Sequence, residues 1–459
     1  MKAFIQDAIK SVPADFIEVR IEDTSQLSIS FSGRNLVKAQ QTRDFGGYVR
    51  ALVKGGWGFI SFNQPEKLKE YVRIAVDRAA GIGGGDARLA PVPIVESKTV
   101  VELDPDKDPR KVTFEEKVAM FRRFADGLLA GGEKIISSGV GYNEVFRHIV
   151  ISTSEGTYLD NEGLWCAGGL SAIGRDGPVV QSVHSGFGTQ RDWSDIVAGE
   201  SAIAGVIRDT EELLGAAPVK GGRYTVILDP RLAGVFIHEA FGHLSEADTV
   251  ADNPKLGEKM RLGTRFGQDH LNIIDCGNLE DERGSYAYDD EGTPSTHTYL
   301  VKDGILAGRL HSRETAARLG EAPTGNARTI NYRFPPICRM SNTYIGPGGS
   351  SFEEMLEGVE HGLYVVGGGS GNTSTGLFTF NAERAMVIEK GRLGGLVRDL
   401  MLTGNVFETM ADIDMVAGDL KRSRSGYCGK SYGQRMQYPL MVSMGSPHIR
   451  IQNVLIGGC

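Results

Sequence analysis

Cysteine is scarce in this chain of 459 residues, and its five cysteines are scattered along the sequence. Five is also an odd number, which argues against a disulfide framework and suits free thiols in a reducing cytoplasm. One such thiol is therefore available as a metal ligand. The five positions are Cys166, Cys276, Cys338, Cys428 and Cys459.

Long apolar runs and basic clusters are missing as well. The N-terminal segment is interrupted by Gln6, Asp7 and Lys10, so it lacks the apolar core of a signal peptide. No stretch approaches the roughly 18 apolar residues of a membrane span. The net charge of -8, from 50 basic and 58 acidic side chains, argues against a nucleic-acid-binding surface. We expect a cytoplasmic protein that binds neither a membrane nor a nucleic acid.

Glycine, in contrast, is abundant, with 61 residues where a share of roughly 7% is usual. The glycines lie between short apolar runs, as in GGYVRALVKGGWGFISF, and they follow no collagen-like period. This arrangement is typical of tight turns and bends in β-structure.

The chain is too long for one hydrophobic core, and its patterns indicate three domains. Residues 1–80 are predicted as an α+β subdomain made of helix, strands and helix. A linker rich in Gly, Pro and Asp, 81–110, opens a second α+β subdomain, 81–218, in which strands are again followed by a closing helix. The shared order suggests an internal duplication. Residues 219–459 are predicted to form a large, mostly antiparallel, β-rich C-terminal domain that carries the active-site helix, so the fold class is α+β.

Several helices have recognisable signals. Thr113 and Glu116 have the spacing of a capping box, which predicts a helix that begins there. A closing helix is expected from about Ser194 to Leu214, and a short one within 351–362. The helix that closes the first subdomain has an apolar stripe of Leu68, Val72, Ala75, Val76 and Ala79.

The C-terminal domain opens with a helix that carries two histidines and a glutamate. Asp229 and Pro230 are typical of an N-cap residue followed by the first helical position. The motif HEAFGH is one residue wider than the H-E-x-x-H of zinc metalloproteases. At about 100° per residue, positions i and i+5 lie roughly 140° apart, which places His238 and His243 on different faces of an ideal helix. One explanation is that the H-E-x-x-x-H motif arises by chance and that the histidine is a core residue whose hydrogen bonds are satisfied within the protein.

Two features favour a shared site for the histidines. Glu239 follows the apolar run 235–237, where an unpaired carboxylate is costly, and a catalytic task explains its placement. Gly242 allows the backbone to depart from α geometry just before His243. A single π-type turn at 240–242 would bring both histidines onto one face, and such turns are frequent at functional sites.

A catalytic zinc ion takes three protein ligands plus water, so a third ligand is needed. Glu246 and Asp248 lie just downstream, and Cys428, in SGYCGKSYGQ, is a distant candidate in a glycine-rich turn. A buried free thiol is the other explanation of Cys428. The GKS within this segment is not a phosphate-binding loop, because Arg424 stands where that motif requires glycine.

The sequence resembles the TldD/PmbA metallopeptidases, also called modulators of DNA gyrase, and is similar to the TldD branch. The resemblance rests on HEAFGH at 238–243, GNARTINYRFPPICRMSNTYIGPG at 325–348 and GLFTFNAERAMVIEKGRLGGLVRDLMLTGN at 376–405, and on GYCGKSYGQ and the terminal IRIQNVLIGG. The resemblance is strong over the C-terminal half, which carries these motifs. Over the first 218 residues it rests on the order of the predicted helices and strands.

The resemblance implies a zinc site and a reaction. His238, His243 and Cys428 would bind Zn²⁺, and Glu239 would be the general base that takes a proton from zinc-bound water. Glu246 and Asp248 would support the site, with metal ligation as the minor alternative.

Family members act on unfolded peptides in an enclosed cavity, with the substrate held as an added strand. Arg328 would contact a peptide carboxylate or carbonyl, or else form an internal salt bridge. Arg384 lies in a segment that borders the family's cleft, and its effect on substrate choice is open.

The resemblance also implies a dimer, formed with a second copy or with a metal-free PmbA-like paralogue. A catalytically silent peptide-binding or assembly subunit is the alternative function. All three expected ligands and the glutamate are present, which favours the zinc-dependent peptidase. Direct modulation of DNA gyrase has no support from the acidic composition.

Overall fold

The computed structural model describes residues 1–374 and 376–458. Cys459 lies outside the described residues, and the other four cysteines are free and buried. Within the described part of the chain, no helix is both long enough and apolar enough to cross a membrane.

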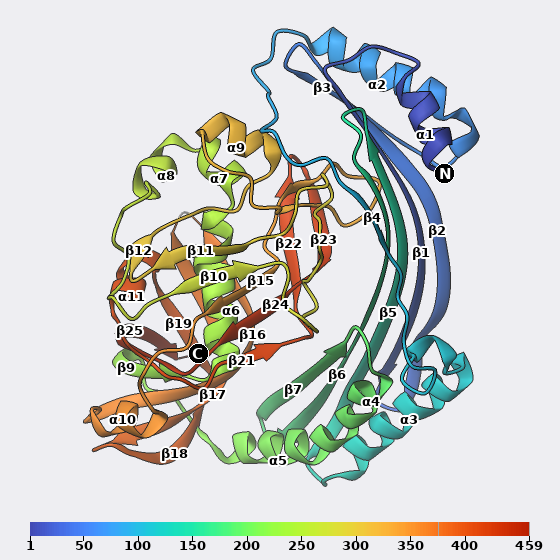
Figure 1. Cartoon of the computed structure of the whole chain (residues 1–459). Helices are drawn as coiled ribbons and strands as arrows, with labels where there is room; N and C mark the ends of the chain where they lie inside the picture. Colours follow the sequence, from blue (N-terminus) through green and yellow to red (C-terminus); the bar gives the residue numbers. More distant parts are fainter. Residues whose placement is uncertain (375, 459) are drawn as a thin grey trace.

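The N-terminal half forms one long, curved sheet, drawn in blue and green in Figure 1. Its strands run in the order β3-β2-β1-β5-β6-β4, with β7 paired to β6. Strands β1 and β5 join the two halves of this sheet in antiparallel register, from Glu18 opposite Thr153 to Ser32 opposite Gly139. The strands are β1 (Phe16–Ser32), β2 (Asn35–Val53), β3 (Gly56–Phe62), β4 (Glu96–Thr99), β5 (Ile135–Thr153), β6 (Tyr158–Asp176) and β7 (Val179–Thr189).

Helices cover the outer, convex side of this sheet, as Figure 1 shows. They are α1 (Lys2–Ile9), α2 (Leu68–Ile82), α3 (Phe114–Ala130), α4 (Trp193–Val197) and α5 (Ala202–Gly215). The capping box of Thr113 and Glu116 is present, and all five apolar residues predicted for the stripe of α2 are buried. The predicted closing helix is divided into α4 and α5 by a 3₁₀ turn, Ala198–Ser201.

Each half of the sheet has the order helix, three antiparallel strands, helix, which agrees with the suggested duplication. The two predicted subdomains therefore share a single sheet. Sequence patterns did not indicate this, because the pairing of β1 with β5 joins residues more than 100 positions apart.

The C-terminal half contains a closed barrel, because β16 pairs with both β9 and β17. The barrel order is β16-β9-β25-β19-β17, and β18, β8 and β20 extend it. These strands are β8 (Ala217–Pro218), β9 (Gly222–Leu228), β16 (His361–Ser374), β17 (Leu377–Glu389), β18 (Arg392–Arg398), β19 (Leu400–Asn405), β20 (Ile413–Val416) and β25 (Ile449–Gly458).

A second sheet has the order β12-β11-β10-β15-β24-β21, and two small ribbons, β13-β14 and β22-β23, stand apart from it. The strands are β10 (Ile273–Cys276), β11 (His297–Lys302), β12 (Ile305–Leu306), β13 (Ala327–Arg328), β14 (Ile337–Cys338), β15 (Asn342–Ile345), β21 (Lys421–Ser423), β22 (Tyr427–Tyr432), β23 (Arg435–Met441) and β24 (Ser443–Ser446). Most strand pairs are antiparallel, so the predicted α+β class with a β-rich C-terminal domain is confirmed.

Helix α6 (Pro230–Ile237) lies between the barrel and the second sheet, in contact with β16 on one side and β24 on the other. The remaining helices are α7 (Ala247–Ala251), α8 (Pro254–Lys259), α9 (Arg313–Leu319), α10 (Phe352–Glu357) and α11 (Val406–Ala411). Helix α10 confirms the short helix expected within 351–362, with Ser351 and Glu354 as its capping box.

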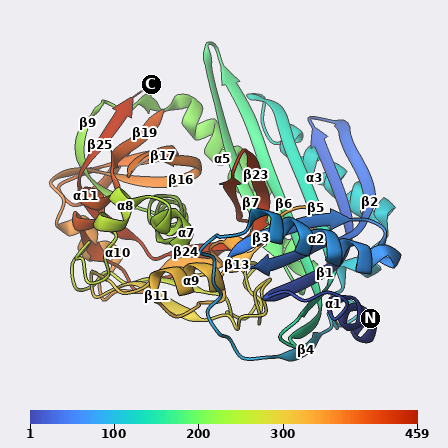
Figure 2. The ribbon, with the colours of Figure 1, turned by 90° about the horizontal axis from the view of Figure 1, so that it is seen from above.

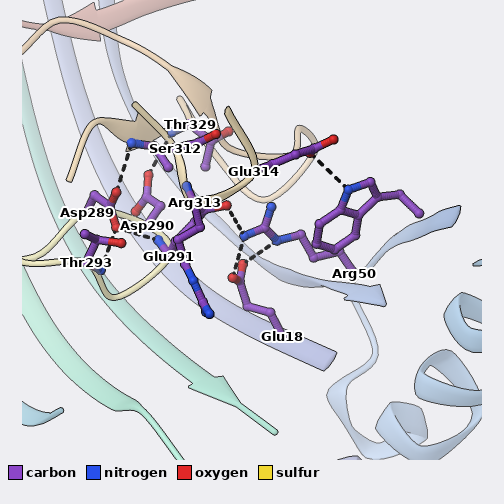
Figure 3. A network of polar contacts seen from close by, with 12 residues as sticks. Glu18, Arg50, Asp289, Asp290, Glu291, Thr293, Ser312, Arg313, Glu314 and Thr329 are labelled. Atoms are coloured by element: carbon purple, nitrogen blue, oxygen red, sulfur yellow. Dashed lines mark hydrogen bonds and ion pairs between the residues drawn. The ribbon is translucent and has the colours of Figure 1, made fainter. Parts of the chain in front are cut away.

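The long sheet and the C-terminal domain lie side by side in both views, with β23 between them (Figures 1 and 2). Buried ion pairs connect them. Arg50 contacts Glu18 of its own sheet and Glu291 of the C-terminal domain, each at 2.7 Å, and Arg20 contacts Asp290. Figure 3 shows Arg50 between Glu18 and Glu291. Because these charges are buried, separating the two halves would leave them without partners.

Candidate metal centre

The helix that carries the histidines begins as the sequence predicts. The Asp229 carboxylate accepts a hydrogen bond from the Leu232 N–H at 3.0 Å, and Pro230 occupies the first turn. After Ile237 the helix widens into a π-helical turn, His238–Gly242, in which the His243 N–H donates to the His238 carbonyl. This i→i+5 bond places residues five apart on the same face.

The two imidazoles consequently face each other. Their ring centroids lie 5.3 Å apart, with the ring planes 79° to one another. The predicted π-type distortion is thus confirmed, and it answers the objection that His238 and His243 would point in different directions.

Gly242 has a different role from the expected one. Its dihedral angles, φ -56° and ψ -49°, are ordinary right-handed helical values that any residue adopts. A Cβ at this position would lie only 2.1 Å from the Sδ of Met340. Close packing against Met340, rather than backbone freedom, is therefore what calls for glycine here.

The third side chain at the centre comes from the β22–β23 ribbon. A β-bulge between Cys428 and Lys430 interrupts the pairing of β22 with β23. The Cys428 Sγ lies 3.6 Å from the His243 Nε2. One potential ligand atom from each of His238, His243 and Cys428 lies within 4.8 Å of the other two. The structure thus brings together residues separated by almost 200 positions.

The residues present fit a zinc ion. Both ring nitrogens of His238 are buried, and neither has a hydrogen-bond partner among the described residues. A buried imidazole without any partner is costly, and a metal ion would satisfy one of its nitrogens. Two imidazoles and one thiolate form a donor set of catalytic zinc, which leaves a fourth position for water or substrate.

The neighbouring histidines favour the thiolate form of Cys428. Burial alone would raise the pKa of this thiol, but His238 and His243 outweigh burial and hold the pKa well below its ordinary value. The thiolate is the form that binds metal.

Glu246 orients His243 from the side opposite Cys428. Its Oε2 lies 3.1 Å from the His243 Nδ1 and 3.0 Å from the Lys430 Nζ. Burial opposes the charge on Glu246, but Lys430 and His243 lower the pKa of Glu246 to about 2. An ionised Glu246 accepts a hydrogen bond from the Nδ1–H of His243 and leaves the Nε2 of His243 free to bind a metal.

Asp248 accepts a hydrogen bond from Lys430 at 2.6 Å. Neither Glu246 nor Asp248 belongs to the group of three converging ligand atoms in the described chain. Glu246 contacts His243 and Asp248 contacts Lys430, and their supporting role stays a prediction. The sequence did not single out Lys430, because its partner Asp248 lies 182 positions away in the chain.

Glu239 lies at the accessible side of the centre. Its Oε2 is 3.8 Å from the His243 Nε2, and 26% of its side chain is exposed. His238 and Cys428, in contrast, are buried at 0% and 1% exposure. A molecule that reaches the centre therefore meets Glu239 and His243 first.

The two predicted arginines lie elsewhere. Arg328 is buried and donates to the main-chain carbonyls of Met340 and Met441, at 2.6 and 2.9 Å, and its guanidinium stacks on Tyr286. Arg328 thus donates to main-chain carbonyls and, among the described residues, does not form the internal salt bridge that was one of its two expected roles. Its other expected role, in peptide binding, stays a prediction. Arg384 contacts Asp209 of helix α5 at 2.6 Å.

Three models of one protein family match consecutive parts of the chain. Residues 17–81 match PmbA/TldA metallopeptidase domain 1, residues 107–215 match the central domain, and residues 221–458 match the C-terminal domain. The chain belongs to the PmbA/TldA metallopeptidase family. The site described above lies within the part matched by the C-terminal domain of that family.

Relatives of this PmbA/TldA chain extend over nearly its whole length. A metalloprotease of Synechocystis is 40% identical over 445 residues, 97% of this chain and 95% of the relative. The zinc metalloprotease TldD homologue of Saccharolobus solfataricus is 30% identical over 426 residues, 90% of each chain.

Solved structures share the fold of this family member. A protein of Thermotoga maritima described as a modulator of a DNA gyrase superposes with a TM-score of 0.80 at 19% identity, and TldE of Thermococcus kodakarensis with 0.76 at 18%. In both comparisons the whole of each chain is covered. At these identities the likeness extends to the fold alone.

Proposed function

We propose that this chain is a zinc-dependent peptidase, in which His238, His243 and Cys428 hold the metal and Glu239 is the general base. The observation that carries the proposal is the convergence of three ligand atoms beside a buried imidazole whose two nitrogens have no protein partner in the described chain. The names of the relatives, metalloprotease and zinc metalloprotease, support the same activity.

When bound, zinc supplies a Lewis acid that polarises the scissile carbonyl and lowers the pKa of water. Glu239 handles the proton, because its carboxylate faces the same space as the His243 Nε2. In the proposed reaction Glu239 accepts a proton from the attacking water as the C–O bond forms. It then donates that proton to the leaving nitrogen as the C–N bond breaks.

Glu246 and Lys430 keep the centre in position during this reaction. Glu246 fixes the ring of His243, and Lys430 fixes Glu246 and Asp248. Because these groups are already paired, they need no rearrangement when a substrate binds.

The proposed substrates are unfolded peptides. Only about a quarter of the His243 and Glu239 side chains is exposed, so a thin, extended chain reaches the centre more readily than a folded surface does. The strand that carries Cys428 pairs with β23 alone within the described sheets, which leaves its other edge open to an added strand.

The test compares wild-type protein with Glu239→Gln on an unstructured, fluorescence-quenched peptide. We expect hydrolysis to fall about 10²–10⁴-fold while the zinc content is unchanged, because the substitution removes the base but no ligand. Equal rates for the two proteins would refute the role of Glu239. Peptide binding without any cleavage by the wild type would support the silent-subunit alternative.

We further propose that the active particle is a dimer, either of two copies or of one copy with a metal-free PmbA-like paralogue. Native mass measurement of the chain alone, and of the chain mixed with such a paralogue, distinguishes the two. A monomer in both samples would contradict the proposal.

A further inference from the structure

A cavity of about 510 Å³ lies between the long sheet and the C-terminal domain, within the size range of ligand pockets. Trp57 and Phe59 of β3 form one part of its lining, and residues 335–338 form another. Lys430 and Ser431 of β22 also line it. The cavity therefore reaches the strand that carries Cys428, but it lies beside the metal centre rather than within it.

Three cations and three acids are among the residues that line this cavity. Its three lining cations are each paired: Arg50 with Glu18 and Glu291, Arg318 with Asp252, and Lys430 with Glu246 and Asp248. Each lining cation is thus already neutralised, and the lining acids Asp248 and Asp252 are among these partners. The lining contains one further acid, Glu314.

Glu314 is the acid without a cation. Its Oε2 accepts a hydrogen bond from the Trp57 indole at 3.0 Å. No lysine, arginine or histidine nitrogen of the described chain forms an ion pair with it, although Arg50 and Arg318 act on it through space. Burial raises the pKa of Glu314 above its ordinary value, which reflects the cost of an unpaired charge. A cation that entered the cavity would offset this cost.

The walls around Glu314 are held firmly. The Arg50 guanidinium lies 5.0 Å from the centre of the Trp57 ring and is itself fixed by Glu18 and Glu291. Glu291 also accepts a hydrogen bond from the Arg313 N–H, next to Glu314 in the chain. Figure 3 shows Glu314 at the end of this network, beyond Ser312 and Arg313. The Trp57 ring that donates to Glu314 therefore packs against an arginine that is itself held in place.

We propose that this cavity binds a cationic group of the peptide substrate, with Glu314 as its partner. The inference rests on the proposed peptidase function. The group is an ammonium or guanidinium, carried by a lysine or arginine side chain or by the free N-terminus of the peptide. The apolar surfaces of Trp57, Phe59 and Ile337 suit the methylene stem of such a side chain, whose charged end reaches Glu314.

The strand geometry places this subsite away from the bond that is cut. Residues on a strand advance by roughly 3.3 Å each, and Lys430 and Ser431 follow Cys428 by two and three positions. A peptide that runs along β22 would therefore place its cationic group a few residues from the scissile bond. A lysine scan over the positions that flank this bond locates the subsite.

The experiment measures binding separately from cleavage. Fluorescein-labelled unstructured peptides, with one lysine moved through the sequence or replaced by norleucine, are titrated against the zinc-loaded Glu239→Gln protein by anisotropy. At one position, we expect the lysine peptide to bind about tenfold more tightly than the norleucine peptide, because its ammonium pairs with a partly buried carboxylate. N-acetylated and free peptides distinguish a side chain from an N-terminal ammonium.

The deciding variant is Glu314→Gln in the same background, which keeps the shape and the capacity to accept from Trp57. We expect the lysine preference to disappear while the affinity for the norleucine peptide is unchanged. Glu258→Gln, an exposed acid on α8, loses the same charge outside the cavity and should keep the preference.

Two results would overturn the inference: equal binding of lysine and norleucine peptides at every position, or the same preference in Glu314→Gln as in its parent. Neither depends on hydrolysis, so failure of the peptidase proposal is seen separately, as an absence of cleavage by the wild type.

Discussion

The Nδ1 of His243 lies 3.1 Å from the Oε2 of Glu246, three residues further along the chain. On the opposite side of the same ring, Nε2 lies 3.6 Å from the Cys428 Sγ. The ring is thus aimed at the centre by a carboxylate that is itself fixed by Lys430. A short segment of the chain supplies both a candidate ligand and the group that orients it.

Glu246→Gln tests this orientation. The variant loses the charge that pairs with Lys430 and polarises His243, so we expect zinc affinity to fall about 10–100-fold. Competition with a chromogenic chelator measures the affinity. Asp252→Asn is the matched control, because Asp252 pairs with Arg318 at the surface and should leave the affinity unchanged. Unchanged affinity in Glu246→Gln would show that the orienting contact is dispensable.

Gly242→Ala tests the close packing at the π-turn. The added methyl would collide with the Met340 thioether, which is itself buried, so we expect a loss of about 1–3 kcal/mol in the free energy of unfolding. Urea unfolding measures it. Gly257→Ala in α8 meets only ordinary contacts and should be neutral or stabilising by about 0.5–1 kcal/mol. A stable Gly242→Ala protein would mean that Met340 moves aside freely.

Arg50→Met tests the contact between the long sheet and the C-terminal domain. It leaves Glu18 and Glu291 buried without their shared cation, so we expect a loss of about 3–5 kcal/mol in the free energy of unfolding. Arg43→Met removes an arginine from an exposed pair with Asp23 and should have a much smaller effect. Equal losses in the two variants would contradict the importance of burial.

Local signals predicted much of this molecule. The stripe on α2, the capping box of Thr113 and Glu116 and the Asp-Pro start of α6 depend on neighbouring residues, and all are present. The π-turn was also predictable, because two histidines five apart share one face only if the helix widens.

Long-range pairing was out of reach by the same reasoning. No periodicity indicates that β1 and β5 join two subdomains into one sheet, or that β16 closes a barrel by pairing with two strands. Lys430 and Glu314 were missed for the same reason. Their importance comes from partners that only the folded chain brings near. Lys430 contacts Glu246, and Glu314 accepts a hydrogen bond from Trp57.

Metal analysis shows whether His238, His243 and Cys428 hold one zinc ion together. Zinc content is measured by mass spectrometry of wild-type, His238→Ala and Cys428→Ala proteins purified in parallel. We expect about one equivalent in the wild type and strongly reduced zinc in both variants, since catalytic zinc has three protein ligands. Full zinc occupancy in Cys428→Ala would contradict the three-ligand centre.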